Sequence, residues 1–350
     1  MRVGIIGAGI QAKVAHLPAF SKIEGVEIIG IADINEKSAK LLSKKFDIPD
    51  VYTDYHDLIG NNNVDLISIC TPNQLHRRIA IECALAGKHI LIEKPMATTV
   101  KDADEIVETA KENGVKLCVV QNYRLFPSVK ETKKRIENGR IGEIISMHSY
   151  GHLLQSFNRS WILKSRAGVI EDFGPHLIDI ILYLNNFDNI KKVYAIGGNF
   201  GGHLELIVHA QIIIEFENKS IATLDLSWLS GAKEIAVYVQ GTGGLLHTDI
   251  RNNHIQEIHH YSTPLDDISS ISKKLKRTAK GAISGEYFSG AKTYYTELIE
   301  NFIEHIENNR KLLITGEECR KTAIIIENAY KSIKENRPIS LDKDYFNGKV

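Results

Sequence analysis

The sequence has few cysteines, and their spacing excludes the small disulfide-stapled and zinc-ribbon classes of protein. Only four occur in 350 residues, and they stand far apart at Cys70, Cys83, Cys118 and Cys319 with no CxxC pair. A chain of this length can bury a hydrophobic core without disulfide bonds. We therefore expect four reduced cysteines that pack inside a cytoplasmic protein.

An excess of charge of either sign is also absent. Lys plus Arg total 43 and Asp plus Glu total 43, so the formal net charge is zero. This balance argues against a surface devoted to nucleic acid or to an anionic membrane. No uncharged apolar run approaches the ~18 residues of a membrane span. The opening MRVGIIGAGI carries no signal-peptide cleavage site, so we expect a cytoplasmic protein with neither nucleic-acid nor membrane partners.

The chain is long enough for about two domains, and the pattern of predicted strands and helices changes near residue 121. Before this point, short apolar runs alternate with helical patterns. The runs are 2–6, 26–32, 64–69, 89–92 and 115–120, and the helical patterns are 11–20, 35–46, 74–86 and 100–113. This alternation predicts βαβ units, and hence a doubly wound parallel sheet covered on both faces over residues 1–121. Pro18 is expected to kink the first helix.

After residue 121, consecutive strands separated by turns replace the alternation. We expect helices at 128–138, 169–184, 287–309 and 316–336, with strands at 141–151, 191–196, 204–216, 221–228, 234–240, 245–250 and 254–261. Strands and helices arranged in this way predict an α+β domain over 122–350, built on an antiparallel or mixed sheet.

The first strand leads directly into Gly7-Ala8-Gly9-Ile10-Gln11-Ala12, a G-x-G-x-x-A turn that opens a helix. Gly7 permits the tight turn, Gly9 lets a pyrophosphate approach the backbone, and the small Ala12 lets the helix pack on the sheet. Asp33 ends the second strand, 24 residues beyond Gly9. A carboxylate near this spacing binds the 2′-hydroxyl of a ribose. The alternative is a glycine turn followed by a helix-capping Asp.

The position of Asp33 also predicts which dinucleotide binds. A carboxylate there repels a 2′-phosphate, and no Arg follows it closely. We therefore expect the cofactor to be NAD rather than NADP.

Two further loops lie at the carboxyl ends of predicted strands, where doubly wound folds bind their ligands. One is Thr71-Pro72-Asn73-Gln74-Leu75-His76, and the other is Glu93-Lys94-Pro95. A charged pair fixed by a proline at this edge indicates a functional site. The alternative is that Lys94 is only the ion-pair partner of Glu93.

The segment 167–179 places Asp172, His176 and Asp179 on one face of a predicted helix, at i, i+4 and i+7. A carboxylate beside a His orients the imidazole and raises its pKa, which suits a general base. The alternative is a buried histidine with a purely structural role, whose ring nitrogens are hydrogen-bonded within the core. Pro175 lies inside the pattern and can disturb the geometry between Asp172 and His176.

The motifs occur together in a fixed order: the glycine turn, TPNQLH, EKP, QNYRLFP and AGVIEDFGPHLID. In this combination the chain resembles the glucose–fructose oxidoreductase / inositol dehydrogenase / rhizopine catabolism (Gfo/Idh/MocA) family over essentially its whole length. It departs from the common pattern in having Ala167-Gly168 where two or three glycines are frequent, and in carrying Glu171 beside Asp172.

The resemblance implies a Rossmann domain followed by an α+β domain with a large open, mostly antiparallel sheet, whose exposed face makes homodimers or homotetramers. It also implies roles for individual residues. The catalytic set is Lys94, Asp172 and His176; the cofactor-binding set is Gly7, Gly9, Ile10, Gln11, Ala12, Asp33, Thr71, Pro72, Asn73, His76, Glu93, Lys94 and Asn122; the substrate-binding set is Lys94, Tyr123, Arg124, Trp161, Arg166, Asp172 and His176. No metal is expected.

The implied activity is NAD-dependent hydride transfer at a secondary hydroxyl of a sugar, nucleotide sugar or cyclitol. In this hypothesis His176, oriented by Asp172, accepts the hydroxyl proton, while Lys94 hydrogen-bonds the developing alkoxide. Two alternatives stay open at this point. One is an enzyme with tightly bound NAD that uses transient oxidation, in an internal redox cycle or for glycosidic elimination. The other is a catalytically silent NAD and sugar sensor.

Overall fold

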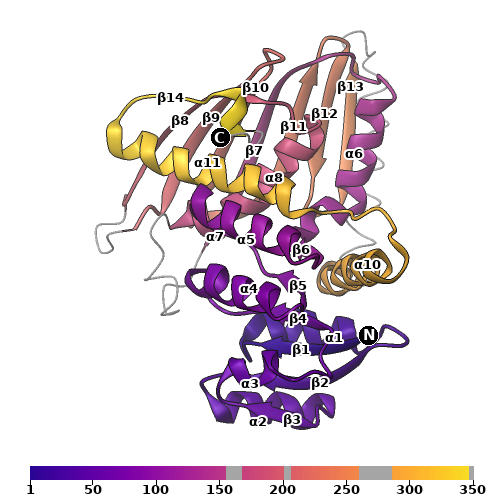
Figure 1. Cartoon of the computed structure of the whole chain (residues 1–350). Helices are drawn as coiled ribbons and strands as arrows, with labels where there is room; N and C mark the ends of the chain where they lie inside the picture. Colours follow the sequence, from indigo (N-terminus) through magenta and orange to yellow (C-terminus); the bar gives the residue numbers. More distant parts are fainter. Residues whose placement is uncertain (155–167, 201–205, 260–285, 347–350) are drawn as a thin grey trace. The chain divides into compact units, whose positions relative to one another are not determined.

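A computed structural model describes residues 1–154, 168–200, 206–259 and 286–346. The chain forms two compact units. The first contains Met1–Asn122 together with Phe288–Ala323, and the second contains Tyr123–Tyr287 together with Ile324–Val350. Each unit is built on its own sheet (Figure 1).

The sheet of the first unit has six parallel strands in the order β3-β2-β1-β4-β5-β6. The strands are β1 (Arg2–Ile6), β2 (Glu27–Ala32), β3 (Asp50–Tyr52), β4 (Leu66–Ile69), β5 (His89–Ile92) and β6 (Leu117–Val119). The strand order reverses between β1 and β4. Ligands of doubly wound sheets bind at such a switch point, outside the carboxyl ends of the strands.

Helices connect these strands, and the first of them is irregular. Its opening turn is a π-helix, η1 (Ala12–His16), in which the backbone N–H of Leu17 donates to Ala12 O; α1 (Leu17–Phe20) follows with Pro18 in its first turn. Because Pro18 has no N–H, it cannot continue the i→i−4 ladder, which fits the expected irregularity here. The other helices are α2 (Glu36–Phe46), α3 (Tyr55–Ile59), α4 (His76–Leu85) and α5 (Val100–Glu112).

The segment Phe288–Ala323 returns to the first unit, although the sequence pattern places it in the second domain. It contains most of α10 (Glu286–Asn308) and the start of α11 (Gly316–Glu335). Thr315 forms an antiparallel bridge with Cys118 on the edge strand β6, and Arg320 forms an ion pair with Asp104 of α5. The returning segment therefore covers one edge of the parallel sheet.

The second unit has an eight-stranded mixed sheet in the order β13-β12-β11-β7-β10-β9-β8-β14. Only β7 and β10 pair in parallel; all other pairs are antiparallel. The strands are β7 (Ile144–Leu154), β8 (Ile190–Gly198), β9 (His209–Phe216), β10 (Ile221–Ser227), β11 (Leu229–Gly241), β12 (Gly244–Asp249), β13 (His254–His259) and β14 (Ile339–Ser340).

Helices cover one face of this sheet (Figure 1). The helix α8 (Gly174–Leu184) packs on β7 and β10, and α6 (Pro127–Glu137) packs on β12. Along β9 the residues Ala210, Ile212 and Ile214 are fully buried, whereas their neighbours on the other face are partly exposed or exposed. This alternation is typical of a sheet with one covered face and one open face.

The predicted fold class is confirmed: a doubly wound parallel sheet precedes an α+β unit with a large, mostly antiparallel sheet. The short elements β3, α3, β14 and α12 (Lys343–Phe346) were not expected from the sequence. Among the helices that the structure describes, none is both long and apolar enough to span a membrane.

Candidate functional site

The glycine turn after β1 has the geometry that close approach of a ligand requires. Gly7 has φ = +101°, and a Cβ built on it would lie 2.8 Å from the carbonyl carbon and oxygen of Cys70. A Cβ on Gly9 would meet nothing within 4 Å, so the backbone there faces open space. Ala12 is fully buried, while Ile10 and Gln11 are exposed. The turn can therefore receive a pyrophosphate against its backbone.

Asp33 lies directly beside this turn. Its Oδ2 accepts a hydrogen bond from the backbone N–H of Ala8 at 2.6 Å, and its Oδ1 accepts one from the backbone N–H of Asn35 at 2.7 Å. An ionised carboxylate has about four lone-pair sites, so acceptor capacity remains for a ribose hydroxyl. The structure thus brings the predicted acidic residue to the predicted phosphate-binding turn.

Three buried oxygens lie after the carboxyl ends of β4 and β6. Within the described residues, Thr71 Oγ1, Gln121 Oε1 and Asn122 Oδ1 have no hydrogen-bond partner. Buried polar atoms are almost always paired, so these three atoms are available to hydrogen-bond a bound group. A dinucleotide with its carboxamide and ribose hydroxyls supplies donors of the right kind, and the residues present fit NAD.

Gln121 was not among the residues singled out from the sequence. Its side chain is only 1% exposed, and it directly precedes Asn122. Its place just after the last strand of the parallel sheet was the signal that could have identified it, because such sheets bind ligands at that edge.

His76 joins the two loops at this edge. One ring nitrogen, Nε2, lies 3.0 Å from Thr71 O, and the other, Nδ1, lies 2.8 Å from Pro95 O. Burial lowers the pKa of His76, although the carbonyl groups of Pro95 and Thr71 oppose that effect. Pro72 is exposed and Asn73 is partly exposed at the start of the same loop. Direct contact of these three side chains with the cofactor stays a prediction.

The Glu93 carboxylate is buried, and both of its oxygens have partners in the first unit. Oε1 accepts from His16 Nε2 at 2.8 Å and from the Tyr295 hydroxyl at 3.0 Å, and Oε2 accepts from the Lys94 backbone N–H at 3.1 Å. His16 Nδ1 lies 2.8 Å from Ser68 Oγ. The Lys94 residue itself is partly exposed.

His16 and Glu93 form a buried ion pair. Burial acts to lower the pKa of His16, but the sulfur of Cys70 and the Glu93 carboxylate outweigh it and raise this pKa to about 10. Burial acts to raise the pKa of Glu93, and His16 reverses this effect, so the pKa of Glu93 lies below its ordinary value. The pair is therefore an imidazolium and a carboxylate at neutral pH.

In the second unit, the segment predicted as one helix is divided. The short α7 (Val169–Asp172) ends at Phe173, and α8 begins at Gly174 with Pro175 in its first turn. Pro175 lacks an N–H and its ring would clash with the carbonyl group of residue 171 in a continuous helix. The expected disturbance by Pro175 is thus present. Asp172 and His176 lie on consecutive helices and not on one continuous helix.

The backbone conformation just before α7 requires a glycine. Gly168 has φ = +52°, and a Cβ on it would lie 2.1 Å from Ile207 O. The next residue, Val169, donates its backbone N–H to that same oxygen at 2.9 Å. The single glycine of Ala167-Gly168 therefore occupies the position that needs one.

His176 lies in an aromatic cluster. Its ring stacks on Tyr123 at a centroid distance of 4.1 Å and an angle of 14°, and Phe173 meets both rings edge-on. Burial and the charge of Asp172 raise the pKa of Tyr123 to about 12, so the phenol stays protonated. The structure thus places Asp172, Tyr123 and His176 in one neighbourhood, with His176 only 9% exposed.

Arg124 is held in a buried ion pair with Asp179. Its Nε and Nη2 donate to the two carboxylate oxygens at 2.6 Å each, and its guanidinium lies over the Phe187 ring at 4.8 Å. Both side chains are almost completely buried. This geometry gives Arg124 a structural partner, and its role in binding substrate stays a prediction. Trp161 and Arg166 lie outside the described residues.

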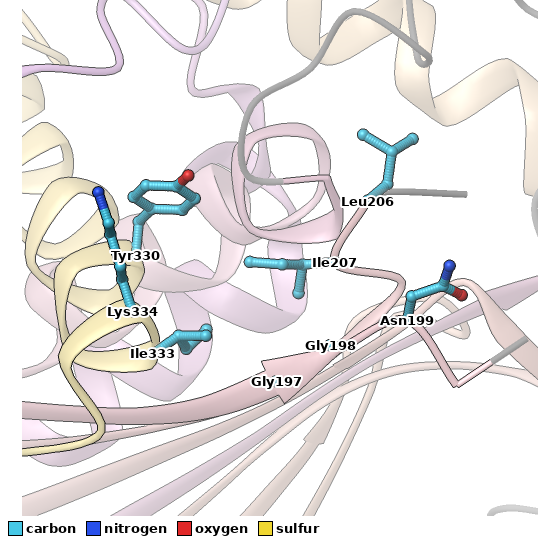
Figure 2. Close-up of a pocket in the computed structure, with 8 residues that line it drawn as sticks. All are labelled: Gly197, Gly198, Asn199, Leu206, Ile207, Tyr330, Ile333 and Lys334. Carbon is cyan, nitrogen blue, oxygen red and sulfur yellow. The ribbon is translucent and has the colours of Figure 1, made fainter. Parts of the chain in front are cut away.

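A separate hollow of about 310 Å³ lies in the second unit, and no predicted site residue lines it. Figure 2 shows side chains of α11 on one side, Leu206 and Ile207 on another, and the end of β8 beneath them. Its lining residues are Gly197, Gly198, Asn199, Leu206, Ile207, Tyr330, Ile333 and Lys334.

The fold and the glycine turn define a dinucleotide-binding protein, and comparison with known proteins narrows the class. Residues 1–121 match the family model "Oxidoreductase family, NAD-binding Rossmann fold", and residues 129–247 match "GFO/IDH/MocA C-terminal domain". The chain therefore belongs to the Gfo/Idh/MocA family of oxidoreductases, and its first unit binds NAD.

Individual relatives match nearly the whole chain at low identity. A myo-inositol 2-dehydrogenase of Thermotoga maritima is 23% identical, with coverage of 98% of this chain and 99% of that protein. A glucose-6-phosphate 3-dehydrogenase of Bacillus subtilis is 24% identical, with coverage of 97% and 98%. The WlbA dehydrogenase of Bordetella pertussis, solved with NADH and UDP-GlcNAcA, shares the fold with a TM-score of 0.81, 21% identity and coverage of 97% and 98%.

The ionised pair predicts how stability depends on pH. The contribution of protonated His16 is complete below its ordinary pKa of 6.5 and is lost as the pH rises through about 10. The contribution of ionised Glu93 is complete above its ordinary pKa of 4.5 and is lost as the pH falls through its lowered value. We expect the stability that the pair adds to be greatest between pH 4.5 and 6.5.

Urea unfolding of the wild type and of Glu93→Gln between pH 5.5 and 10 measures this contribution. The difference in free energy of unfolding should shrink as the pH rises, by at most ~1.4 kcal/mol per pH unit for one proton. A difference that stays constant over this range contradicts the ion pair.

Proposed function

We propose that this protein is an NAD-dependent dehydrogenase that acts on a secondary hydroxyl of a sugar, nucleotide sugar or cyclitol. The observation that carries the proposal is that one chain contains both a glycine turn with Asp33, which fit NAD, in its first unit and a buried His176 beside Asp172 and Tyr123 in its second unit. The relatives' names support the substrate class, since they specify inositol and glucose 6-phosphate. Neither a tightly bound NAD nor a silent sensor is favoured by any observation.

The residues of the first unit would hold the cofactor. The turn at Gly7 and Gly9 faces the pyrophosphate, Asp33 accepts from the adenine-side ribose, and Asn122 offers a buried oxygen to the nicotinamide half. When bound, NAD supplies the acceptor or donor of the hydride. Lys94 donates a hydrogen bond to the substrate oxygen and stabilises negative charge as it develops there.

His176 is the proposed proton acceptor. Its stack on Tyr123 restricts the ring to one plane. The Asp172 carboxylate acts electrostatically on Tyr123 and so lies in the same neighbourhood, where a negative charge would stabilise the imidazolium formed by proton transfer. Tyr123 keeps its own proton at neutral pH, because its pKa is raised to about 12. It therefore orients His176 without competing for the proton.

Removing the imidazole tests this assignment. We expect His176→Ala to lower kcat by ~10²–10⁴-fold while NAD still binds, because a positioned acid/base contributes about that factor. Lys94→Ala should lower kcat and also weaken NAD binding. Steady-state kinetics and fluorescence titration with NADH measure the two effects. His259→Ala serves as the control, because His259 is the exposed last residue of β13. Near-full turnover of His176→Ala would show that another group accepts the proton.

Asp33 should set the choice of cofactor. We expect the wild type to bind NAD(H) more tightly than NADP(H), and Asp33→Ala to reduce this preference by ~10–100-fold. The change removes a charged hydrogen-bond acceptor and its repulsion of the 2′-phosphate. Titration with all four nicotinamide dinucleotides measures the preference, and the exposed Asp57→Ala serves as a control. An unchanged preference in Asp33→Ala rejects the assignment.

The open face of the eight-stranded sheet is the proposed contact between copies of the chain, which would form a homodimer or homotetramer. Ile196, Ile213 and Ile221 lie on this face and are between 43% and 58% exposed. Clustered exposed apolar side chains favour association, because association removes them from water.

A charge on this face should weaken the contact. We expect sedimentation velocity to give a dimer or tetramer for the wild type and a smaller species for Ile213→Lys with an unchanged circular dichroism spectrum. Leu41→Lys, at a residue of α2 that is 63% exposed against 43% for Ile213, should leave the assembly intact. A wild-type monomer at micromolar concentration contradicts the proposal.

The proposed location is the cytoplasm. All four cysteines are free thiols, and three of them are buried. Unpaired cysteines of this kind are typical of proteins in a reducing compartment.

A further inference from the structure

The buried carboxylate of Glu93 lies one residue before the lysine to which the proposed chemistry is assigned. Its two oxygens receive three hydrogen bonds, from His16 Nε2, the Tyr295 hydroxyl and the Lys94 backbone N–H. The residue is 4% exposed. A carboxylate with these partners has little capacity or access left for a ligand, so a role other than cofactor contact needs to be considered.

The partners come from separate elements of the first unit. His16 ends the π-helical turn η1 that follows the glycine turn, Ser68 lies in β4, and Tyr295 lies in α10. Tyr295 also packs edge-on against the His16 ring at 5.4 Å. His16, Ser68, Glu93 and Tyr295 are called the Glu93 network below.

The backbone on the other side of Lys94 is held as well. Pro95 O lies 2.8 Å from His76 Nδ1, and the same ring reaches Thr71 O through Nε2. The Glu93 network fixes the N–H of Lys94, and His76 fixes the carbonyl of the next residue. The lysine thus has its main chain restrained on both sides, while the residue itself remains partly exposed.

We propose that the Glu93 network positions Lys94. By holding the backbone N–H of Lys94, it fixes the orientation of the backbone from which the lysine side chain extends. This inference rests on the proposed function, because it assigns the network to the same lysine. Glu93 and Tyr295 are positioning residues in it, and neither touches substrate or cofactor.

The energetics of a buried ion pair support this interpretation. A buried ion pair is a poor source of stability, since apolar residues of similar volume often stabilise a protein as well or better. Such a pair does fix geometry, because each charge must keep its partner. Catalytic groups need placement within about 0.5 Å, and a displacement of about 1 Å can reduce the rate ~10²-fold.

The test uses two substitutions with a matched pair of controls. Tyr295→Phe removes the hydroxyl that donates a hydrogen bond to Glu93. Glu93→Gln removes the negative charge of the carboxylate with little change in shape. The control pair is Tyr55→Phe and Glu82→Gln, because Tyr55 donates its hydroxyl to Glu82 at 2.6 Å elsewhere in the same unit. Comparing the two pairs separates positioning of Lys94 from the loss of a Tyr–Glu hydrogen bond as such.

Hydrogen–deuterium exchange of the peptide containing the Lys94 amide is the first readout, because it needs neither substrate nor NAD. We expect the exchange of this amide to accelerate about 10-fold in Tyr295→Phe and more in Glu93→Gln, as a hydrogen bond to a charged group is weakened or lost. The two control variants should exchange like the wild type at this peptide. Unchanged exchange in Tyr295→Phe and Glu93→Gln overturns the proposal.

Kinetics supply the second readout. We expect kcat to fall about 10-fold in Tyr295→Phe and about 10²-fold in Glu93→Gln, with the Kd for NADH changed less than about 3-fold. A loss of NADH affinity greater than that of Lys94→Ala would make Glu93 a cofactor contact and overturn the positioning role. If Glu93→Gln fails to fold, Tyr295→Phe alone decides.

A different result would show that the proposed function is wrong. A wild type that binds no nicotinamide dinucleotide and turns over no sugar-type substrate rejects the dehydrogenase. The exchange measurement still determines in that case whether the network restrains the Lys94 peptide.

Discussion

The ion pair between His16 and Glu93 joins the parts of the first unit that carry its chemistry. His16 ends the turn that follows the glycine motif, Glu93 precedes Lys94, and Tyr295 brings α10 to the same carboxylate. Charges removed from water must keep their partners, because an unpaired buried charge is costly. The ion pair therefore ties the turn after the glycine motif to the end of β5, and the Tyr295 hydroxyl adds α10 of the returning segment Phe288–Ala323 to the same carboxylate.

Much of the fold could be predicted because its signals are local. Apolar runs flanked by turn residues identified five of the six parallel strands, and the glycine turn identified the phosphate-binding turn after β1. The strand β3 was missed because Asp50, Val51 and Tyr52 are too short a run to show a period. Pro18 and Pro175 each indicated an irregular helix, since a residue without an N–H cannot continue the ladder of the preceding turn, and each lies in the first turn of the helix that follows.

The site could be predicted only where its residues adjoin in sequence or follow a known spacing. Asp33 and the glycine turn follow a known spacing, and the structure joins them at Ala8. No local pattern indicates the partners of Glu93, because His16 lies 77 residues before it and Tyr295 lies 202 residues after it. Contacts of this range are fixed by tertiary packing. For the same reason the sequence could place Arg124 near a site but could not show that Asp179 holds its guanidinium.

The carboxylates of the chain differ in role through their surroundings and not through their chemistry. Asp179 and Glu93 are buried, and they form ion pairs with a guanidinium and an imidazolium. Asp33 keeps acceptor capacity beside an open turn. A buried carboxylate that is paired with a charged protein group is held in that pair, whereas a carboxylate beside an open turn can also accept a hydrogen bond from a ligand. Burial and the charge of the partner, rather than the count of donors, therefore distinguish Asp179 and Glu93 from Asp33.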